Sequence, residues 1–260
     1  MKKDVVRGVV LRAVDVKNSD RMLTVYTHER GIMSIYARGA KRMDGKSGTS
    51  STAEFAYSEF TVVQKQDKLW SSEISNIRFF DCGMMNFEGY SLNFYVLELF
   101  EHIATAEPDA DLMRLLLNTL YASSERKNDH RLIKAAFEIR LLSHIGYMPD
   151  VTGCSECEAR GRELYFDVVT GSLKCAECTA LGAEDTDTEP HQTLIITEGA
   201  RAALEYSIGC PLEKLFSFTL VGEDLDCFSR AAESYLVRQL DRDFAGLDYI
   251  HNVVLPKKPK

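Results

Sequence analysis

The sequence contains no apolar run close to the ~20 residues that a membrane-spanning helix requires. A secretory signal pattern is also missing, because Arg7, Arg12 and Asp15 interrupt the first apolar stretch and no small-residue cleavage site follows it. The seven cysteines are an odd number, which disfavours a disulfide scaffold. We therefore expect a cytoplasmic protein with reduced thiols. Three isolated cysteines are expected to be buried as small apolar side chains: Cys82, Cys210 and Cys227.

The motifs of common enzyme classes are missing as well. The sequence has no G-x-x-x-x-G-K-[ST] loop for nucleotide phosphates, no G-x-S-x-G nucleophile elbow and no H-E-x-x-H metalloprotease motif. Glutamates stand next to His28 and His102, but that spacing forms neither a catalytic dyad nor a metal site. We therefore expect a protein that is not an enzyme and has no small-molecule substrate.

The net charge of -8 hides an uneven distribution of charge. Residues 1–50 contain eleven Lys and Arg against five Asp and Glu, a balance of +6, so the remaining residues carry -14. A basic segment joined to an acidic body is typical of proteins that bind nucleic acid at one end.

Residues 5 to about 80 have the pattern of β-strands. Five segments are rich in β-branched and aromatic residues, and a long, basic, Gly- and Ser-containing connection at 41–54 separates the third from the fourth. This arrangement favours a closed barrel of the OB type over residues 1–82. An SH3-like barrel or a fragment of a β-sandwich is the alternative.

Alternation along the second and third of these strands separates two faces. Leu23, Val25 and Ile35 occupy the more apolar face, whereas Tyr26 and Tyr36 occupy the other, with Arg38 beyond them. Aromatic rings beside cationic side chains could form a platform on which single-stranded bases stack. The alternative is that tyrosine simply favours half-exposed strand positions.

Beyond residue 85 the apolar residues recur at three- and four-residue spacing, which predicts amphipathic helices. The predicted fold is an α+β multidomain protein, in which an α-helical domain of residues 83–149 and 191–260 follows the barrel. Residues 150–190 interrupt this helical domain as an insertion that ends in an acidic linker at 183–190. The helices are expected at residues 90–106, 108–124, 129–146, 197–209 and 223–244.

The insertion contains two Cys-x-x-Cys pairs separated by seventeen residues. Two such pairs can supply four thiolates in tetrahedral geometry, which predicts a structural zinc ion. The segment between them suggests a hairpin that turns at Thr170 and Gly171 and brings the pairs together. Four cysteines leave no open position for a catalytic water, and no deaminase-type Pro-Cys-x-x-Cys occurs. The predicted ligands are Cys154, Cys157, Cys175 and Cys178.

Two stretches resemble the RecO family of bacterial DNA repair proteins. The first is GVVLRAVDVKNSDRMLTVYTHERGIMSIYARGAKR at residues 8–42, and the second is AFEIRLLSHIGYMPDVTGCSEC at residues 136–157. The order of a basic barrel, helices, a four-cysteine insertion and more helix resembles the same family over nearly the whole chain. Zinc ribbons often place glycine after the second cysteine of a pair, whereas this chain has Glu158 and Thr179.

The resemblance implies a non-enzymatic mediator of DNA repair and homologous recombination. Such proteins bind single- and double-stranded DNA, anneal complementary strands and interact with the single-strand-binding protein SSB. With RecR they help to load RecA onto SSB-coated DNA. A DNA-bound protein of this kind would be associated with the nucleoid.

The basic barrel supplies the candidate DNA-binding residues. The cations would neutralise phosphates, so that two strands can approach each other and pair. The candidates are Arg12, Arg21, Tyr26, Tyr36, Arg38, Lys41, Arg42 and Lys46, with Lys65 and Lys68 as secondary candidates and Trp70 assigned to the core. The acidic tail of SSB would need a basic helical stripe, for which the candidates are Lys127, Arg131 and Lys134, if the helix extends back past Asp129.

Two other classes of function are compatible with the same residues. One is a non-catalytic adaptor in which the barrel binds RNA or protein partners. The other is a metalloenzyme, which the filled cysteine site disfavours.

Overall fold

The computed structural model describes residues 3–16, 19–41, 49–80, 82, 86–125, 127–159, 163–182 and 193–254. The chain forms two compact units, residues 1–125 with 244–260 and residues 126–243. The first unit thus combines the barrel with two helices and the C-terminal segment. The predicted domain boundaries after residues 82, 149 and 190 stay a prediction. The predicted linker at 183–190 lies outside the described residues.

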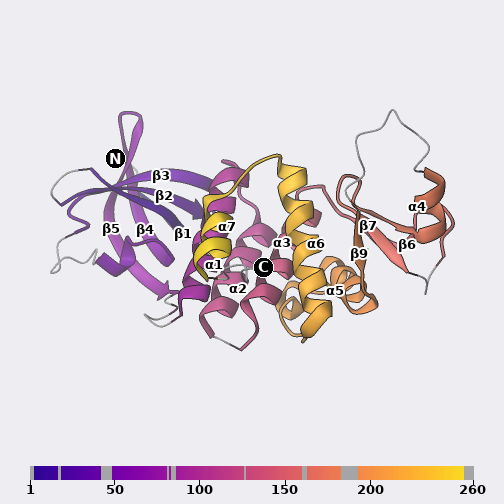
Figure 1. The fold of residues 1–260 in the computed structure, drawn as a ribbon. Helices are drawn as coiled ribbons and strands as arrows, with labels where there is room; N and C mark the ends of the chain where they lie inside the picture. The colour runs from indigo at the N-terminus through magenta and orange to yellow at the C-terminus, as the bar shows by residue number, and fades with distance from the viewer. Residues whose placement is uncertain are drawn as a thin grey trace. The chain divides into compact units, whose positions relative to one another are not determined.

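The first unit begins with a closed five-stranded barrel, as the strand pattern predicted (Figure 1). Neighbouring strands are antiparallel except for β3 and β5, whose parallel pairing closes the barrel. A short 3-10 helix, η1 (Thr49–Ser51), precedes the fourth strand. The strands are β1 (Lys3–Asp15), β2 (Arg21–Thr27), β3 (Gly31–Ala37), β4 (Ala56–Lys65) and β5 (Lys68–Phe79).

The barrel encloses an apolar core. Leu23, Val25 and Ile35 are fully buried in it, which confirms the predicted apolar face of β2 and β3. Phe60 from β4 and Ile74 from β5 complete the same cluster. Burying each of these side chains contributes ~1.5–3 kcal/mol relative to exposing it, so the core rather than the turns determines the register of the strands.

Four helical segments accompany the barrel in the first unit. The side chain of Asn86 caps the first of them by accepting a hydrogen bond from the Gly89 N–H at 3.0 Å. The carboxylate of Glu98 accepts the backbone N–H groups of Ala245 and Gly246 at 3.0 and 2.8 Å, which fixes the start of the C-terminal helix. The segments are α1 (Phe87–Ile103), α2 (Ala110–Glu125), α7 (Ala245–Tyr249) and the π-helical turn η3 (Ile250–Val254).

The second unit packs three long helices with a small sheet of strand order β6-β8-β7-β9. Its helices are α3 (His130–His144), α4 (Ala176–Gly182), α5 (Glu198–Gly209) and α6 (Gly222–Leu240), with the 3-10 turn η2 (Leu212–Lys214). Its strands are β6 (Asp150–Cys154), β7 (Leu164–Asp167), β8 (Ser172–Cys175) and β9 (Thr193–Ile196). The helical periodicity therefore located the long helices of both units. No helix in the described part of the chain is long and apolar enough to cross a membrane.

The predicted hairpin between the cysteine pairs is formed by β7 and β8, which pair antiparallel. Gly171 lies in its turn with φ of +69°, a left-handed conformation that glycine adopts without strain. A Cβ at this position would lie 2.3 Å from the hydroxyl of Tyr235 on α6. The turn is therefore held both by backbone conformation and by a close helix contact.

We expect Gly171→Ala to lower the free energy of unfolding by ~1–3 kcal/mol, because the left-handed conformation is strained for alanine and the new methyl group collides with Tyr235. Gly209→Ala at the end of α5 is the matched control, since a Cβ there meets no atom within 4 Å. Urea unfolding of both variants measures the difference. Equal stabilities would contradict this account of the turn.

Candidate nucleic-acid surface and metal centre

The four predicted cysteines come together at one end of the small sheet. Their sulfur atoms all lie within 4.8 Å of one another, and they are the group of potential metal ligands found among the described residues. Cys157 and Cys175 are 3.8 Å apart at their sulfurs. Four thiolates at ~2.3 Å from one ion have sulfur–sulfur distances of about 3.8 Å. The donor set therefore fits a tetrahedral four-thiolate site.

Backbone donors surround this cysteine cluster. The N–H of Cys175 donates to the sulfur of Cys154 at 3.3 Å. Burial raises the pKa of the Cys154 thiol, but backbone hydrogen bonds from Cys175, Cys157 and Glu156 outweigh this effect and lower the pKa to about 6. A hydrogen bond with Cys175 raises the pKa of Cys178 to about 12. Neighbouring sulfurs and backbone N–H groups thus shift the pKa values of these thiols in opposite directions, and a bound cation would displace the thiol protons.

The residue after the first cysteine pair adopts the conformation that glycine favours at this position of zinc ribbons. Glu158 has φ of +57°, and its N–H donates to the carbonyl oxygen of Cys154 at 2.8 Å. The second pair is built differently, because Cys175 ends β8 and Cys178 lies within α4. Thr179 accordingly continues the helix, and its hydroxyl donates to the carbonyl oxygen of Cys175 at 3.0 Å. The tight turn is therefore required only at the first pair.

The isolated cysteines behave as the sequence predicted. Cys82, Cys210 and Cys227 are buried free thiols. Asn93 donates to the sulfur of Cys82 at 3.1 Å, and the thiol of Cys227 donates to the carbonyl oxygen of Ile195 at the same distance. They belong to the packing of their own units.

Three of the candidate cations of the barrel take part in exposed ion pairs. Asp15 joins two of them, with Arg21 Nε at 3.1 Å and Lys41 Nζ at 2.8 Å. Arg12 contacts Glu101 at 2.5 Å. Surface pairs of this kind contribute only ~0–1 kcal/mol, so a phosphate group can compete for the same cations. Arg42 and Lys46 lie outside the described residues.

The predicted stacking platform of Tyr26 and Tyr36 is wrong, because both rings are buried. Tyr26 is 1% exposed, packs 5.6 Å from the Phe100 ring of α1 and donates to the carbonyl oxygen of Asp109 at 3.4 Å. Tyr36 is 8% exposed and donates to the carboxylate of Asp20 at 2.6 Å. The less apolar face of these strands is covered by other parts of the unit instead of facing solvent.

A half-buried aromatic residue, Trp70, lies on the neighbouring strand β5. This residue was assigned to the core, but it is only half-buried. The parallel pairing of β3 with β5 sets Trp70 opposite Tyr36, with 4.3 Å between the ring centroids. Lys65 lies over the indole, its Nζ 5.6 Å from the ring centroid. Trp70 is thus braced by a buried ring and accompanied by a cation.

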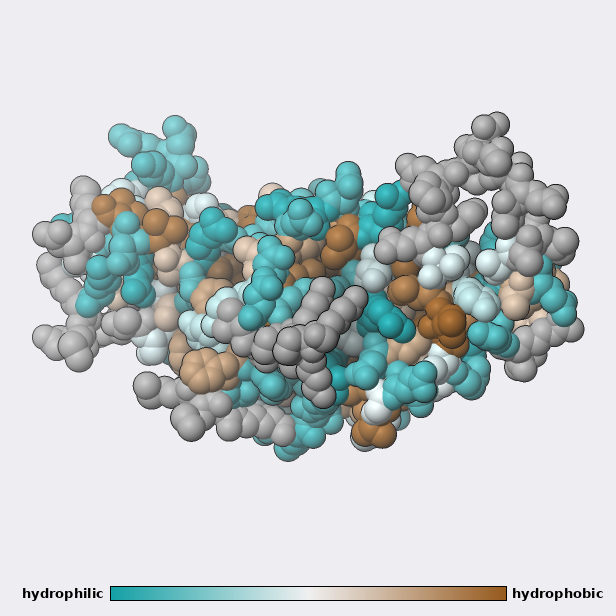
Figure 2. All heavy atoms as spheres, viewed as in Figure 1, coloured by the Kyte–Doolittle hydropathy of each residue, from teal (hydrophilic) through white to brown (hydrophobic). Residues whose placement is uncertain are grey.

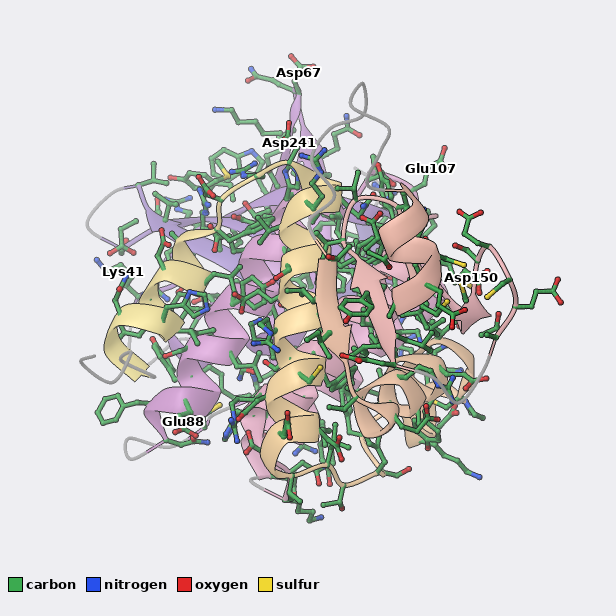
Figure 3. The ribbon with its side chains drawn as sticks, turned by 45° about the vertical axis from the view of Figure 1, so that its right-hand side comes forward. Lys41, Asp67, Glu88, Glu107, Asp150 and Asp241 are labelled. Carbon is green, nitrogen blue, oxygen red and sulfur yellow. The ribbon has the colours of Figure 1, made fainter. Side chains whose placement is uncertain are left out.

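The turn that joins β4 to β5 carries further exposed charge. Lys65 and Lys68 flank Gln66 and Asp67, and all four residues are exposed. Figure 3 shows Asp67 at the projecting tip, well apart from Lys41, and Figure 2 shows this tip as hydrophilic. Arg38, which is also exposed, follows β3 two residues after Tyr36. We define Arg38, Lys65, Lys68 and Trp70 as the hairpin surface.

The predicted basic stripe of Lys127, Arg131 and Lys134 is not formed. Asp129 caps α3 by accepting the Arg131 N–H at 2.8 Å, so the helix begins at His130 and excludes Lys127. Arg131 is paired with Asp226 at 2.6 Å. The side chain of Lys134 is buried and lies 2.7 Å from both Glu138 and Glu233. These side chains do not present three cations on one exposed face.

Comparisons with known proteins agree with this architecture. The model of the recombination protein O N-terminal region matches residues 1–78, and that of the C-terminal region matches residues 84–248. The chain belongs to the RecO family. Similar curated RecO proteins include "DNA repair protein RecO" of Acetivibrio thermocellus, 27% identical over 245 residues and 94% of each chain. That of Clostridium acetobutylicum is 26% identical over 216 residues, 82% of this chain and 83% of its own.

Membership of the RecO family places the chain among proteins of DNA repair and recombination. The resemblance stated from residues 8–42 and 136–157 is thereby confirmed. Trp70 is the residue of the hairpin surface that the sequence pattern placed wrongly, in the core. A single tryptophan between two lysines and two serines, in a strand that alternates poorly, was the available signal that Trp70 is not in the core.

For this RecO chain we expect about one equivalent of bound divalent metal, and we expect Cys157→Ser to lose most of it. Serine supplies a poorer ligand for a soft site, and structural four-cysteine sites stabilise their own fold. Metal analysis and thermal unfolding with and without a chelator provide the measurement. Cys227→Ser, at a thiol outside the cluster, should keep the full metal content. Retention of the metal by Cys157→Ser would contradict a four-thiolate centre.

The buried hydrogen bond of Asp20 predicts a dependence of stability on pH. The Tyr36 hydroxyl and then the Gly39 N–H lower the pKa of this carboxyl below its usual value. The carboxylate therefore stabilises the fold above the ordinary aspartate pKa of ~3.9, and this contribution is lost as the pH falls through the lowered pKa. We expect Asp20→Asn to reduce the fall in unfolding free energy between pH 5 and 2, as measured by urea unfolding. A slope as steep as that of the unaltered chain would contradict this role.

Proposed function

We propose that this chain is a recombination mediator that binds single- and double-stranded DNA and anneals complementary strands. With RecR it would help to load RecA onto single-stranded DNA coated with SSB, in the cytoplasm and in association with the nucleoid. The observation that carries the proposal is that two consecutive RecO family models span residues 1–78 and 84–248. The proposed activity makes and breaks no covalent bond, so the chain would not be an enzyme.

The hairpin surface is the proposed site of contact with DNA. Its exposed cations would neutralise phosphates, and Trp70 would provide the flat ring on which an unpaired base stacks. Arg12, Arg21 and Lys41 would exchange their carboxylate partners for phosphates, and Arg42 and Lys46 extend the same basic segment of sequence. Tyr36 would act as a support for Trp70 rather than as a stacking residue.

Annealing would follow from the same electrostatics. Two DNA strands repel each other through their phosphates, and a cationic surface that holds both lowers this repulsion so that complementary bases can pair. Binding of this kind releases condensed counterions and weakens steeply with salt. The carboxylate-rich remainder of the chain would be left for protein partners.

The cysteine cluster would hold Zn2+ in a structural role. Four thiolates favour zinc among the common divalent ions, and they fill its coordination shell. A structural zinc site contributes ~10–16 kcal/mol to local folding, which suits a sheet whose strands are only four or five residues long. The ion would hold β6, the β7–β8 hairpin and α4 together.

We expect Trp70→Ala to weaken binding of single-stranded DNA by ~1–3 kcal/mol, because each base–aromatic stack contributes about this much. Binding of double-stranded DNA should change little, since paired bases are not available for stacking. Arg38→Ala should weaken both ligands and reduce the salt dependence by about one ion. Fluorescence anisotropy of labelled oligonucleotides measures the affinities. The single tryptophan also gives an intrinsic quenching signal.

Arg230→Ala, at an exposed position on α6, is the matched control for Arg38. Equal losses in the two arginine variants would contradict the proposed DNA surface. An equal effect of Trp70→Ala on single and double strands would contradict base stacking. Markedly tighter binding to RNA than to DNA would favour the adaptor interpretation instead.

We further expect Lys65→Gln/Lys68→Gln to slow annealing of complementary oligonucleotides coated with SSB, because fewer phosphates of the two strands are neutralised together. Glutamine removes the charge but keeps an extended polar side chain, only one atom shorter than lysine. The assay follows the appearance of duplex with time. An unchanged annealing rate would show that this turn does not contribute to annealing.

A further inference from the structure

The first unit also contains an apolar groove that shares only Arg12 with the proposed DNA-contacting residues. It has a volume of about 570 Å3 and follows one side of α1. Its apolar lining comes from β1, α1 and α7, and three glutamates and one arginine complete it. We call this the α1 groove, lined by Leu11, Tyr90, Phe94, Leu97 and Tyr249, with Arg12, Glu54, Glu98 and Glu101.

Large aromatic side chains of this groove are exposed to solvent. Tyr90 is 48% exposed, Phe94 36% and Tyr249 46%, and Phe87, one helical turn before Tyr90, is 67% exposed. Figure 3 marks the start of this helix at Glu88. Exposed apolar groups gathered at one place mark interaction sites, because a monomer gains nothing by leaving them in water.

The rings are held in place without any partner. Tyr90 and Phe94 pack edge to face, with 4.8 Å between their ring centroids. Both also pack edge to face against the buried ring of Phe55, at centroid distances of 5.4 and 5.0 Å. Edge-to-face pairs of this kind contribute ~0.5–1.5 kcal/mol beyond the area they bury. The aromatic wall is therefore preorganised, which reduces the entropy cost of binding a partner.

The charge of the groove selects among partners. Glu98 accepts two backbone N–H groups of α7, Glu54 accepts the Ala13 N–H at 3.4 Å, and Glu101 is paired with Arg12. Three carboxylates thus face one guanidinium. Burial, together with the nearby carboxylates of Glu54 and Glu98, raises the pKa of Glu101 despite its arginine partner. An additional cation in the groove would be favoured, whereas a phosphate or an acidic peptide would be repelled.

We propose that the α1 groove docks a partner protein through a basic amphipathic helix, whose apolar side chains enter the groove while its Lys or Arg side chains meet the glutamates. This is the helix-in-groove mode of recognition, in which a stripe of apolar anchors lies between aromatic and aliphatic walls. The proposal goes beyond DNA binding, because three of the four charged side chains that line the groove are glutamates, which repel phosphates.

Two other occupants of the α1 groove can be distinguished from a basic partner helix by experiment. A second copy of the chain would bury the same rings in a dimer. The basic sequence LPKKPK at residues 255–260 follows η3 and could compete for the groove from within the chain. A basic partner helix differs from both, because it binds in trans and does not require self-association.

The test uses the full chain and a labelled peptide, KLLKKLLKKLLK, with ELLEELLEELLE as its acidic counterpart. We expect the basic peptide to bind and the acidic one not to bind. Tyr90→Ala should weaken binding about tenfold, as loss of an aromatic anchor does at protein interfaces. Glu54→Gln/Glu101→Gln should weaken it similarly while keeping the acceptors for Ala13 and Arg12. Tyr121→Ala, which is 42% exposed on α2 outside the groove, is the matched control.

Several outcomes overturn the proposal. Equal affinity of Tyr90→Ala and Tyr121→Ala for the basic peptide would show that the groove is not its site. Binding of the acidic peptide would show that the charge argument is wrong. A dimer in sedimentation that Tyr90→Ala dissociates would assign the groove to a second copy. At least tenfold tighter peptide binding after deletion of residues 255–260 would assign it to this segment. Unchanged thermal unfolding of the variants shows that each is folded, and DNA binding should stay unchanged in Tyr90→Ala and Tyr121→Ala.

Discussion

The parallel pairing of β3 with β5 is the contact on which the proposed DNA surface of the barrel depends. It joins strands that are more than thirty residues apart at Ile35 and Leu69 and at Tyr36 and Trp70, and it closes the barrel. Closure removes the exposed edges that an open sheet of five strands would present. The same pairing places the Trp70 ring against Tyr36 and sets the start of β5 beside the middle of β3. Fold and candidate DNA surface thus arise from one local arrangement.

The sequence predicted the elements of the barrel but not which side of them meets solvent. Alternation correctly divided β2 and β3 into two faces, because the side-chain period of a strand is local. It could not reveal that Phe100 of α1 covers Tyr26, or that Trp70 covers Tyr36, because both covers come from distant positions in the chain. Residues on the second face of a barrel strand are therefore poor candidates for binding until the covering elements are known.

Helical spacing likewise failed to predict which charged side chains are exposed. Spacing alone suggested that Lys127, Arg131 and Lys134 share one exposed face. The cap at Asp129 removes the first of them from the helix, and Glu138 with Glu233 draws the third into a buried ion pair. A lysine is rarely buried unless it is paired, and here Glu233 comes from a helix 99 positions further along the chain. The cysteines were predictable because a four-thiolate site constrains residue type and spacing together.

Trp70 and the Tyr90–Phe94 pair of the first unit lie in opposite electrostatic surroundings, and this difference separates their proposed ligands. Trp70 is accompanied by Lys65, whereas Tyr90 and Phe94 share a groove with Glu54, Glu98 and Glu101. Aromatic rings attract bases and apolar side chains alike, so the rings by themselves do not choose between nucleic acid and protein. The neighbouring charges make that choice, because phosphates are drawn to cations and repelled by carboxylates. A protein that binds DNA and a protein partner at the same time can therefore direct them to separate surfaces of one small unit, without a conformational change.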